Sequence, residues 1–302
     1  MLGEGFYAGT SPPADRIAHR AETKNTRRFG PRDKRSTLNS PMSIEQLKPQ
    51  ISVIIPCWNE EKNLEHGVLD QVHQYLVQQS YPWEVVIVND GSTDNSKSLI
   101  EGFIKDKPHF ALYDIPHGGK PAGVWMGIQQ ARGDIVLFTD MDQSTPIGEL
   151  SNLWPWYREG YDVVIGSRGI VREGTSLIRK LGSLVFLSLR RLFLLRSIQD
   201  TQCGFKSCRR EAALEIFPRL QYFKQQGQPT GWKVSAYDVE LLYLFERAGY
   251  RIKEVVVHWR NRDLSDTKTQ KGGLAQYLHE SIEMGREVAR VKRNQLKGLY
   301  DG

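Results

Sequence analysis

Two aspartates one residue apart, Asp140 and Asp142, follow the apolar run at residues 134–139. Carboxylate oxygens are the ligands that hard divalent cations such as Mg²⁺ or Mn²⁺ prefer, and a cation bound there could bridge the oxygens of a diphosphate. The same residues could instead begin a turn and cap the next helix, because aspartate is common in both places. The pair taken alone therefore leaves a metal site and a turn open.

Asp90 follows a second apolar run, residues 84–89. Its carboxylate could accept a hydrogen bond from the ring N–H of uracil or guanine. The following Gly91 and Ser92 equally favour a turn and a helix N-cap, so both interpretations stay open. Glu60 is most simply part of the acidic first turn of a helix, where the helix dipole favours negative charge.

The elements that must position these residues alternate regularly along the chain. Apolar runs cover residues 51–56, 84–89, 110–115 and 134–139, and segments of helical length cover residues 59–79, 94–105 and 122–131. Strands that are apolar throughout and separated by helices predict an α/β fold, with a mostly parallel central sheet and helices on both faces. Ligands of such sheets bind outside the carboxyl ends of the strands, where the acidic residues follow the runs.

Beyond Gly166 the pattern changes. The apolar segment 177–198 contains several arginines and a lysine, too many charges for a helix that crosses a bilayer. An apolar face beside a basic face suits an amphipathic helix in the membrane interface, and a core helix with a solvated basic edge is the alternative. Periodicity further predicts a helix at 238–248, a strand at 251–257 and a basic helix within 273–297.

Composition and charge bound the function. The chain has 302 residues, a net charge of +6 and three cysteines, which are too few for a disulfide framework and indicate a reducing cytosol. Residues 1–49 are rich in arginine without apolar periodicity, so we expect a mobile basic tail, with a transit peptide as the weaker alternative. No nucleic-acid-binding motif is present, and we expect no such partner.

Six segments occur in an order that resembles a known family: ISVIIPCWNEE, VVIVNDGSTDNS, GIQQARGDIVLFTDMD, VVIGSRG, DTQCGFKSC and YDVELLYLFERAGYRIKEVVV. They resemble the family 2 glycosyltransferases, in the branch of dolichyl-phosphate mannose synthase and dolichyl-phosphate glucosyltransferase. The resemblance implies a nucleotide-diphospho-sugar transferase (GT-A-like) fold. It implies a catalytic domain over residues 50–265, which includes segment 177–198, followed by a C-terminal basic helix over 266–302.

The resemblance also implies a nucleotide-sugar site. Its expected residues are Pro56, Trp58, Glu60, Lys120 and Asp140, with Asp90 reading the base.

Asp140 and Asp142 would bind Mg²⁺ or Mn²⁺. The mannose synthase pattern has a glutamine two places after the second aspartate, where this chain has Ser144, so the third metal ligand stays open between Ser144 and Gln143. Pro121 stands where the family usually has glycine, which would stiffen the preceding loop.

The acceptor side would be basic. Arg168 would face the phosphate of a lipid acceptor, although a surface arginine ending a strand is the alternative. Arg260, Arg262 and Lys268 would belong to a mobile loop that closes over the diphosphate. Asp200 and Lys206 would lie near the sugar, and a purely structural pairing of the two is the alternative.

The implied activity is an inverting, metal-dependent transfer of a hexose from a nucleotide sugar of the UDP-glucose or GDP-mannose class to a polyprenyl or dolichyl phosphate. The acceptor phosphate is already anionic, with a second pKa of about 6, so no side-chain base is required. Asp142, Arg168 and Arg260 would hold the two anions together.

The protein would then lie peripherally on the cytoplasmic face of a membrane. A transferase with a soluble or protein acceptor, or a non-catalytic nucleotide- or lipid-binding relative, are the alternatives.

Overall fold

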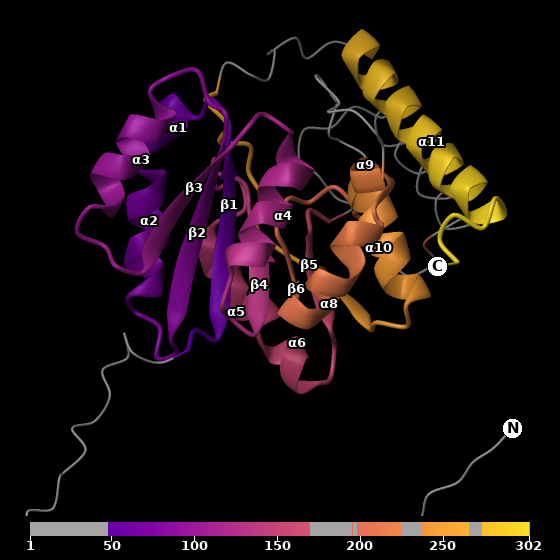
Figure 1. The fold of residues 1–302 in the computed structure, drawn as a ribbon, viewed down its shortest axis with the longest axis horizontal. Helices are drawn as coiled ribbons and strands as arrows, with labels where there is room; N and C mark the ends of the chain where they lie inside the picture. The colour runs from indigo at the N-terminus through magenta and orange to yellow at the C-terminus, as the bar shows by residue number, and fades with distance from the viewer. Residues whose placement is uncertain (1–47, 170–194, 196–197, 225–236, 266–273, 302) are drawn as a thin grey trace, which may run out of the picture. The chain divides into compact units, whose positions relative to one another are not determined.

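The computed structural model describes residues 48–169, 195, 198–224, 237–265 and 274–301 (Figure 1). Residues 42–302 form one compact unit, and residues 1–41 form another that lies outside the described ranges. Residues 1–47 of the predicted basic tail, Lys268 and most of segment 177–198 therefore lie outside the described residues. At the end of that segment Leu195 and Ile198 are described, and both side chains are buried.

Seven strands of the described chain form one sheet, in the order β3-β2-β1-β4-β6-β5-β7. The strands are β1 (Ile51–Cys57), β2 (Trp83–Asp90), β3 (Phe110–Ile115), β4 (Ile135–Phe138), β5 (Val163–Ser167), β6 (Lys206–Arg209) and β7 (Ile252–Val256). Strands β1 to β4 pair in parallel, as do β5 and β7, whereas β6 runs antiparallel to both of its neighbours. The predicted mostly parallel sheet is confirmed.

Helices cover both faces of this sheet (Figure 1). One face packs against α1 (Glu61–Glu65), α2 (Val68–Leu76), α3 (Ser96–Ile104), η2 (Ile147–Glu149), α5 (Leu150–Leu153) and α6 (Pro155–Arg158). The other packs against α4 (Lys120–Gln130), α8 (Arg210–Ile216), η3 (Phe217–Arg219), α9 (Gln221–Lys224) and α10 (Tyr237–Arg247), and α11 (Leu274–Leu296) packs on α10. This arrangement confirms the prediction of an α/β fold with helices on both faces.

Alternate residues of each central strand enter opposite halves of the core. Ile54 of β1 lies in the cluster beneath α4, whereas its neighbours Val53 and Ile55 lie in the cluster beneath α2. The two faces of β2 divide in the same way between Val86 and Val85. Because both faces are covered, most positions of these strands are apolar, and the buried hydroxyl of Ser52 in β1 donates a hydrogen bond to Glu84 of β2 at 2.6 Å.

Several elements differ from the sequence prediction, among them one helix and one strand. The single helix expected over residues 59–79 is wrong, because the chain breaks between α1 and α2 at Gly67, whose φ of 71° lies in the left-handed region. Strand β6 was not predicted, since its four residues contain a lysine, a serine and an arginine and form no apolar run.

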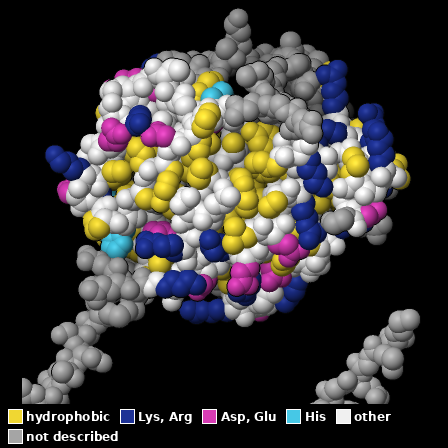
Figure 2. Space-filling model, viewed as in Figure 1, with side chains coloured by type: hydrophobic (Ala, Val, Ile, Leu, Met, Phe, Trp, Pro, Cys, Tyr) yellow, Lys and Arg dark blue, Asp and Glu magenta, His cyan; other side chains and the backbone are white. Residues whose placement is uncertain are grey.

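In the described ranges no helix is both long enough and apolar enough to cross a lipid bilayer. On the face drawn in Figure 2, hydrophobic side chains gather over the middle, and Lys and Arg side chains line the side where Figure 1 shows α11. The exposed residues at the end of α11 include Arg293, Leu296 and Lys297.

Candidate active site

The carboxyl ends of three neighbouring strands meet at one edge of the sheet. Strands β2, β1 and β4 lie side by side and parallel, so the residues that follow them share this edge. Trp58 and Glu60 follow β1, Asp90 ends β2, and Asp140 and Asp142 follow β4. The structure therefore brings the residues predicted for the donor side to one edge.

Asp90 holds the loop that precedes α4. Its buried carboxylate accepts hydrogen bonds from the backbone N–H groups of Gly118 at 2.7 Å and Gly119 at 2.8 Å, and His117 Nδ1 lies 3.1 Å from the same carboxylate. Burial raises the pKa of Asp90, and the hydrogen bonds and charge from this loop offset only part of that rise. A carboxylate has about four lone-pair sites, so Asp90 can accept a further N–H group.

Trp58 lies over the same loop. Its ring stacks on the ring of His117, with 4.6 Å between centroids and 21° between planes, and the side chain remains 40% exposed. Pro56 packs below, where a Cβ at Gly123 of α4 would lie 3.1 Å from the Pro56 Cβ. The exposed flat ring of Trp58 can therefore receive another planar group.

Glu60 joins the end of β1 to two other segments. Its backbone N–H donates to Ser96 Oγ at 2.8 Å, and its carboxylate accepts a hydrogen bond from Asn63 of α1. Asn63 also donates to Asp263 Oδ1 at 3.3 Å. Glu60 thus lies at the site edge, but its carboxylate supports the contact between α1 and the segment after β7.

The first aspartate of the Asp140-Met141-Asp142 triplet is paired with a lysine. Lys120 Nζ forms an ion pair with the Asp140 carboxylate. Burial alone would lower the pKa of Lys120, but the charges of Asp140, Asp238 and Asp142 raise it overall, so Lys120 stays protonated. A Cβ at Gly204 would lie 1.9 Å from Asp140 Oδ2, so the glycine permits this carboxylate to lie where it does.

The residues after Asp140 bear on the third metal ligand. Asp142 is buried and accepts a hydrogen bond from the Ser144 N–H at 2.8 Å, while Ser144 Oγ accepts one from the Arg262 N–H at 3.1 Å. Gln143 is 1% exposed, has a φ of 49°, and donates from Nε2 to the Asp140 carbonyl at 2.9 Å. Its Oε1 has no hydrogen-bond partner within the described part of the chain. An unused amide oxygen beside two carboxylates fits the donor set of Mg²⁺ or Mn²⁺.

Arg168 lies at the end of β5 and is paired with Asp200. The guanidinium donates from Nε to Oδ2 at 2.7 Å and from Nη2 to Oδ1 at 2.8 Å, and Trp259 lies 5.6 Å from its central carbon. Burial would raise the pKa of Asp200, but the hydrogen bonds and charge of Arg168 lower it overall. Arg168 directly follows a strand, as the alternative of a surface arginine had it, but its side chain is mostly buried and paired with Asp200.

The alternative pairing of Asp200 with Lys206 is wrong. Lys206 Nζ lies 2.8 Å from Asp238 Oδ1 and donates to the carbonyl of Cys203. Lys206 is 1% exposed, so the turn before β6 directs it inward, to the first turn of α10, and leaves Asp200 to Arg168. Two separate ion pairs result, and each joins a cation to a carboxylate distant in the sequence.

The segment after β7 reaches the triplet through its backbone. The Arg260 N–H donates to the Ser144 carbonyl at 2.9 Å, next to the bond from Arg262 to Ser144 Oγ. The Arg262 side chain donates to Gln71 Oε1 of α2 at 3.3 Å, and the Arg260 side chain is exposed. The backbone of the two arginines thus lies beside Ser144, whereas the predicted third member of their loop, Lys268, lies outside the described residues.

Sequence reasoning missed two residues at the start of α10. Tyr237 and Asp238 are buried, and Asp238 interacts electrostatically with both Lys120 and Arg168, which the sequence analysis assigned to the donor and acceptor sides. In the sequence they look like the beginning of an ordinary helix. The one sequence feature that could have pointed to them is their place at the start of YDVELLYLFERAGYRIKEVVV, one of the six segments that resemble the family.

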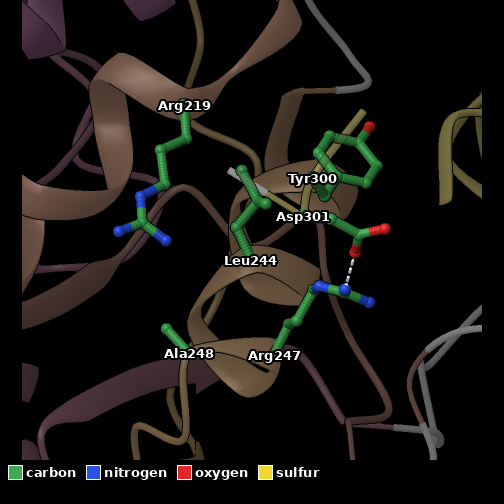
Figure 3. Close-up of a pocket in the computed structure, with 6 residues that line it drawn as sticks. All are labelled: Arg219, Leu244, Arg247, Ala248, Tyr300 and Asp301. Carbon is green, nitrogen blue, oxygen red and sulfur yellow. Dashed lines mark hydrogen bonds and ion pairs between the residues drawn. The ribbon is translucent and has the colours of Figure 1, made fainter. Parts of the chain in front are cut away.

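A hollow of about 280 Å³ lies elsewhere, between the end of α10 and the C-terminal residues (Figure 3). Figure 3 shows Arg247 paired with Asp301 across it and Arg219 on the opposite wall. None of its lining residues belongs to the edge where the strand ends meet.

Comparison with known families identifies the family of the chain. Residues 52–217 match the family model described as Glycosyl transferase family 2, a range that contains the triplet, Asp90 and Arg168. The chain belongs to glycosyltransferase family 2.

Relatives within this family share most of the chain. The glycosyltransferase is 34% identical over 285 residues to the dolichyl-phosphate beta-glucosyltransferase of Drosophila melanogaster. The aligned residues cover 87% of this chain and 81% of that protein. The glycosyltransferase is also 30% identical over 274 residues to the Saccharomyces cerevisiae protein of the same name, covering 83% of this chain and 76% of that one.

Solved structures of low sequence identity share the fold. Mannosyl-3-phosphoglycerate synthase from Rubrobacter xylanophilus superimposes with a TM-score of 0.56 at 17% identity, covering 83% of this chain and 75% of that one. Glucosyl-3-phosphoglycerate synthase from Mycobacterium tuberculosis, in complex with Mn²⁺ and UDP, gives a TM-score of 0.53 at 18% identity, covering 83% and 85%. The predicted GT-A-like fold of this glycosyltransferase is confirmed.

Proposed function

We propose that this glycosyltransferase moves glucose from UDP-glucose to the phosphate of dolichol or a related polyprenol. The names of its relatives, which share about a third of its residues over most of both chains, carry this choice of sugar and acceptor. Glucose thereby takes precedence over the mannose that the sequence motifs left open, and the UDP-glucose bound in a solved fold relative supports UDP over GDP.

The donor would lie across the ends of β2, β1 and β4. The exposed Trp58 ring offers a stacking surface for the base, and Asp90 keeps an acceptor site for the ring N–H of uracil. The diphosphate would then extend toward Lys120 and Asp140, where a lysine ammonium can contact phosphate oxygens.

Asp140, Asp142 and the free oxygen of Gln143 would hold a divalent cation there, and we place Gln143 before Ser144 because the Ser144 hydroxyl already accepts a hydrogen bond. Two carboxylates together with substrate phosphates are a common set of Mg²⁺ ligands. Such an ion supplies charge stabilisation for the departing diphosphate. A relative in fold carries Mn²⁺ and UDP in its solved complex, which supports this choice of ion.

The acceptor phosphate would meet Arg168. The guanidinium has five N–H donors and gives two to Asp200, so three remain for phosphate oxygens. An acceptor oxygen then forms a bond to the anomeric carbon as the bond from that carbon to the diphosphate breaks, which releases UDP and inverts the configuration. The protein orients two anions, and the backbone contacts of Arg260 and Arg262 with Ser144 keep two more cations near them.

The lipid acceptor places this reaction at a membrane surface, on the cytoplasmic side where nucleotide sugars would reach it. We propose peripheral association through the amphipathic segment 177–198, most of which lies outside the described residues. Its described end, Leu195 and Ile198, lies in the protein core.

A donor panel tests the proposed function. The protein is incubated with dolichyl phosphate in detergent, a divalent cation and radiolabelled UDP-glucose, UDP-galactose or GDP-mannose, and label in the lipid phase is counted. We expect label from UDP-glucose and none with Asp142→Ala, which should leave the circular dichroism spectrum unchanged. Label from GDP-mannose alone, or normal turnover by the variant, contradicts the proposal.

A further inference from the structure

Tyr237 carries a buried hydroxyl group that has no partner. The residue begins α10, its side chain is 1% exposed, and its phenol oxygen makes no hydrogen bond to any described residue. Buried polar atoms are nearly always hydrogen-bonded, so an unused one indicates a missing ligand or water. Burial raises the pKa of Tyr237, and the charges of Asp238 and Asp140 raise it further, so the phenol is neutral and can donate.

The next residue offers an acceptor at the same place. Asp238 is 8% exposed, and Lys206, which lies 2.8 Å away, is 1% exposed. Lys206 also donates to the Cys203 carbonyl, so its position is fixed from two sides. The phenol of Tyr237 and the carboxylate of Asp238 therefore form a donor and an acceptor supported by a rigid buried cation.

The surrounding charges decide which ligand these groups suit. Asp238 and Asp140 both act electrostatically on the Tyr237 phenol and on Lys120. The proposed cation would offset the charge of Asp140, but Asp238 is not one of its proposed ligands, so its carboxylate repels a phosphate group and accepts hydrogen bonds from hydroxyl groups. A sugar hydroxyl both donates and accepts, so it can satisfy the carboxylate and the phenol together.

The position relative to Asp140 favours the donor sugar. In a nucleotide sugar the hexose directly follows the diphosphate, which the proposed function places at Asp140 and Lys120. We propose that Tyr237 and Asp238 form the subsite that binds hydroxyl groups of the transferred hexose. This inference rests on the proposed function for the location of the diphosphate.

The substitution Tyr237→Phe removes one oxygen atom and nothing else. Because that oxygen has no partner in the ligand-free protein, we expect the melting temperature to stay the same or rise, whereas loss of a structural hydrogen bond would lower it. In calorimetric titrations of the full chain with Mn²⁺, we expect affinity for UDP-glucose to fall roughly tenfold, as for one lost hydrogen bond. Affinity for UDP should not change.

Tyr157→Phe is the matched control. Tyr157 lies in α6 and donates a hydrogen bond of 2.7 Å to Ser207 Oγ. This variant should lower the melting temperature and leave the ratio of the two affinities unchanged. If both variants change the ratio equally, the effect is general and the subsite is wrong.

Kinetics separate the hexose from the acceptor. We expect Tyr237→Phe to raise KM for UDP-glucose and to leave KM for dolichyl phosphate unchanged. Among the UDP-deoxyglucose analogues, the one that lacks the hydroxyl group bound by Tyr237 should bind wild type and variant with equal affinity. A change confined to the acceptor KM overturns the hexose assignment. An unchanged ratio of UDP-glucose to UDP affinity overturns the subsite alone, whereas a protein that binds no UDP overturns the proposed function as well.

Discussion

The guanidinium group of Arg168 and the carboxylate of Asp200 meet side by side, with hydrogen bonds of 2.7 Å and 2.8 Å. The backbone N–H of Arg168 donates a third hydrogen bond to the same carboxylate, at 3.0 Å. The pair joins the end of β5 to the segment before β6, and both side chains are mostly buried. Arg168 can therefore present its remaining N–H groups in one fixed orientation.

Arg168→Ala should affect both the acceptor and the fold. We expect a higher KM for dolichyl phosphate and a free energy of unfolding lower by about 3 kcal/mol, because Asp200 would lose a buried partner. Urea unfolding and initial-rate kinetics measure the two effects. Arg209→Ala, which breaks an exposed pair with Asp162, is the control and should cost less than about 1 kcal/mol without a kinetic effect. Unchanged acceptor kinetics for Arg168→Ala would rule out its proposed role.

The same pair predicts a dependence of stability on pH. Arg168 lowers the folded-state pKa of Asp200 below its unfolded value of about 3.9, so the pair stabilises the fold fully above that pH. The stabilisation is lost as the pH falls below about 4 toward the folded-state pKa. Asp200→Asn should lack this component, so between pH 5 and about 2.5 its free energy of unfolding should fall less than that of wild type. Parallel curves would show that the pair does not titrate in this range.

Sequence patterns were sufficient to predict the strands whose apolar runs match their burial in the fold. The runs at 51–56 and 84–89 form β1 and β2, whose two faces are both covered. Because β2, β1 and β4 are neighbours in the sheet, Asp90 after β2 and Asp140 after β4 lie at the same edge. Ion-pair partners were not predictable in this way. Arg168 and Asp200 are 32 positions apart, and only the antiparallel insertion of β6 brings them together.

Gly204→Ala should impair activity more than stability. The new Cβ would lie 1.9 Å from Asp140 Oδ2, and the end of that side chain can move aside at little energetic cost. A displaced Asp140 no longer matches the donor diphosphate, so we expect kcat/KM to fall by about 100-fold. Gly102→Ala on α3, where a Cβ meets nothing within 4 Å, is the control and should stabilise the protein by about 0.5–1 kcal/mol. Equal activity of the two variants would refute the close contact.

Removing residues 1–45 should leave catalysis largely intact. The described part of the chain begins at Lys48, which the truncated chain keeps and which forms an ion pair with Asp134. The melting temperature and kcat of the truncated protein, measured with UDP-glucose and dolichyl phosphate in detergent, should match those of the full chain. An unfolded product would show that the basic tail is part of the fold.

The buried groups of the site were the hardest to predict. Lys206 lies in a strand without an apolar run and is buried only because Asp238 compensates its charge. The phenol oxygen of Tyr237 has no hydrogen-bond partner because of how α10 packs in the fold, and the sequence of α10 alone does not show this packing. Local pattern therefore located the donor edge, and tertiary packing determined which side chains complete it.

The central claim is that an anionic lipid phosphate receives glucose without a side-chain base. It is tested most directly by comparing transfer of labelled glucose from UDP-glucose to dolichyl phosphate and to dolichol in the same detergent, with the anomeric configuration of the product determined by NMR. We predict a β-linked glucosyl phosphate from dolichyl phosphate and no product from dolichol. Equal transfer to dolichol, or an α-linked product, would contradict the account.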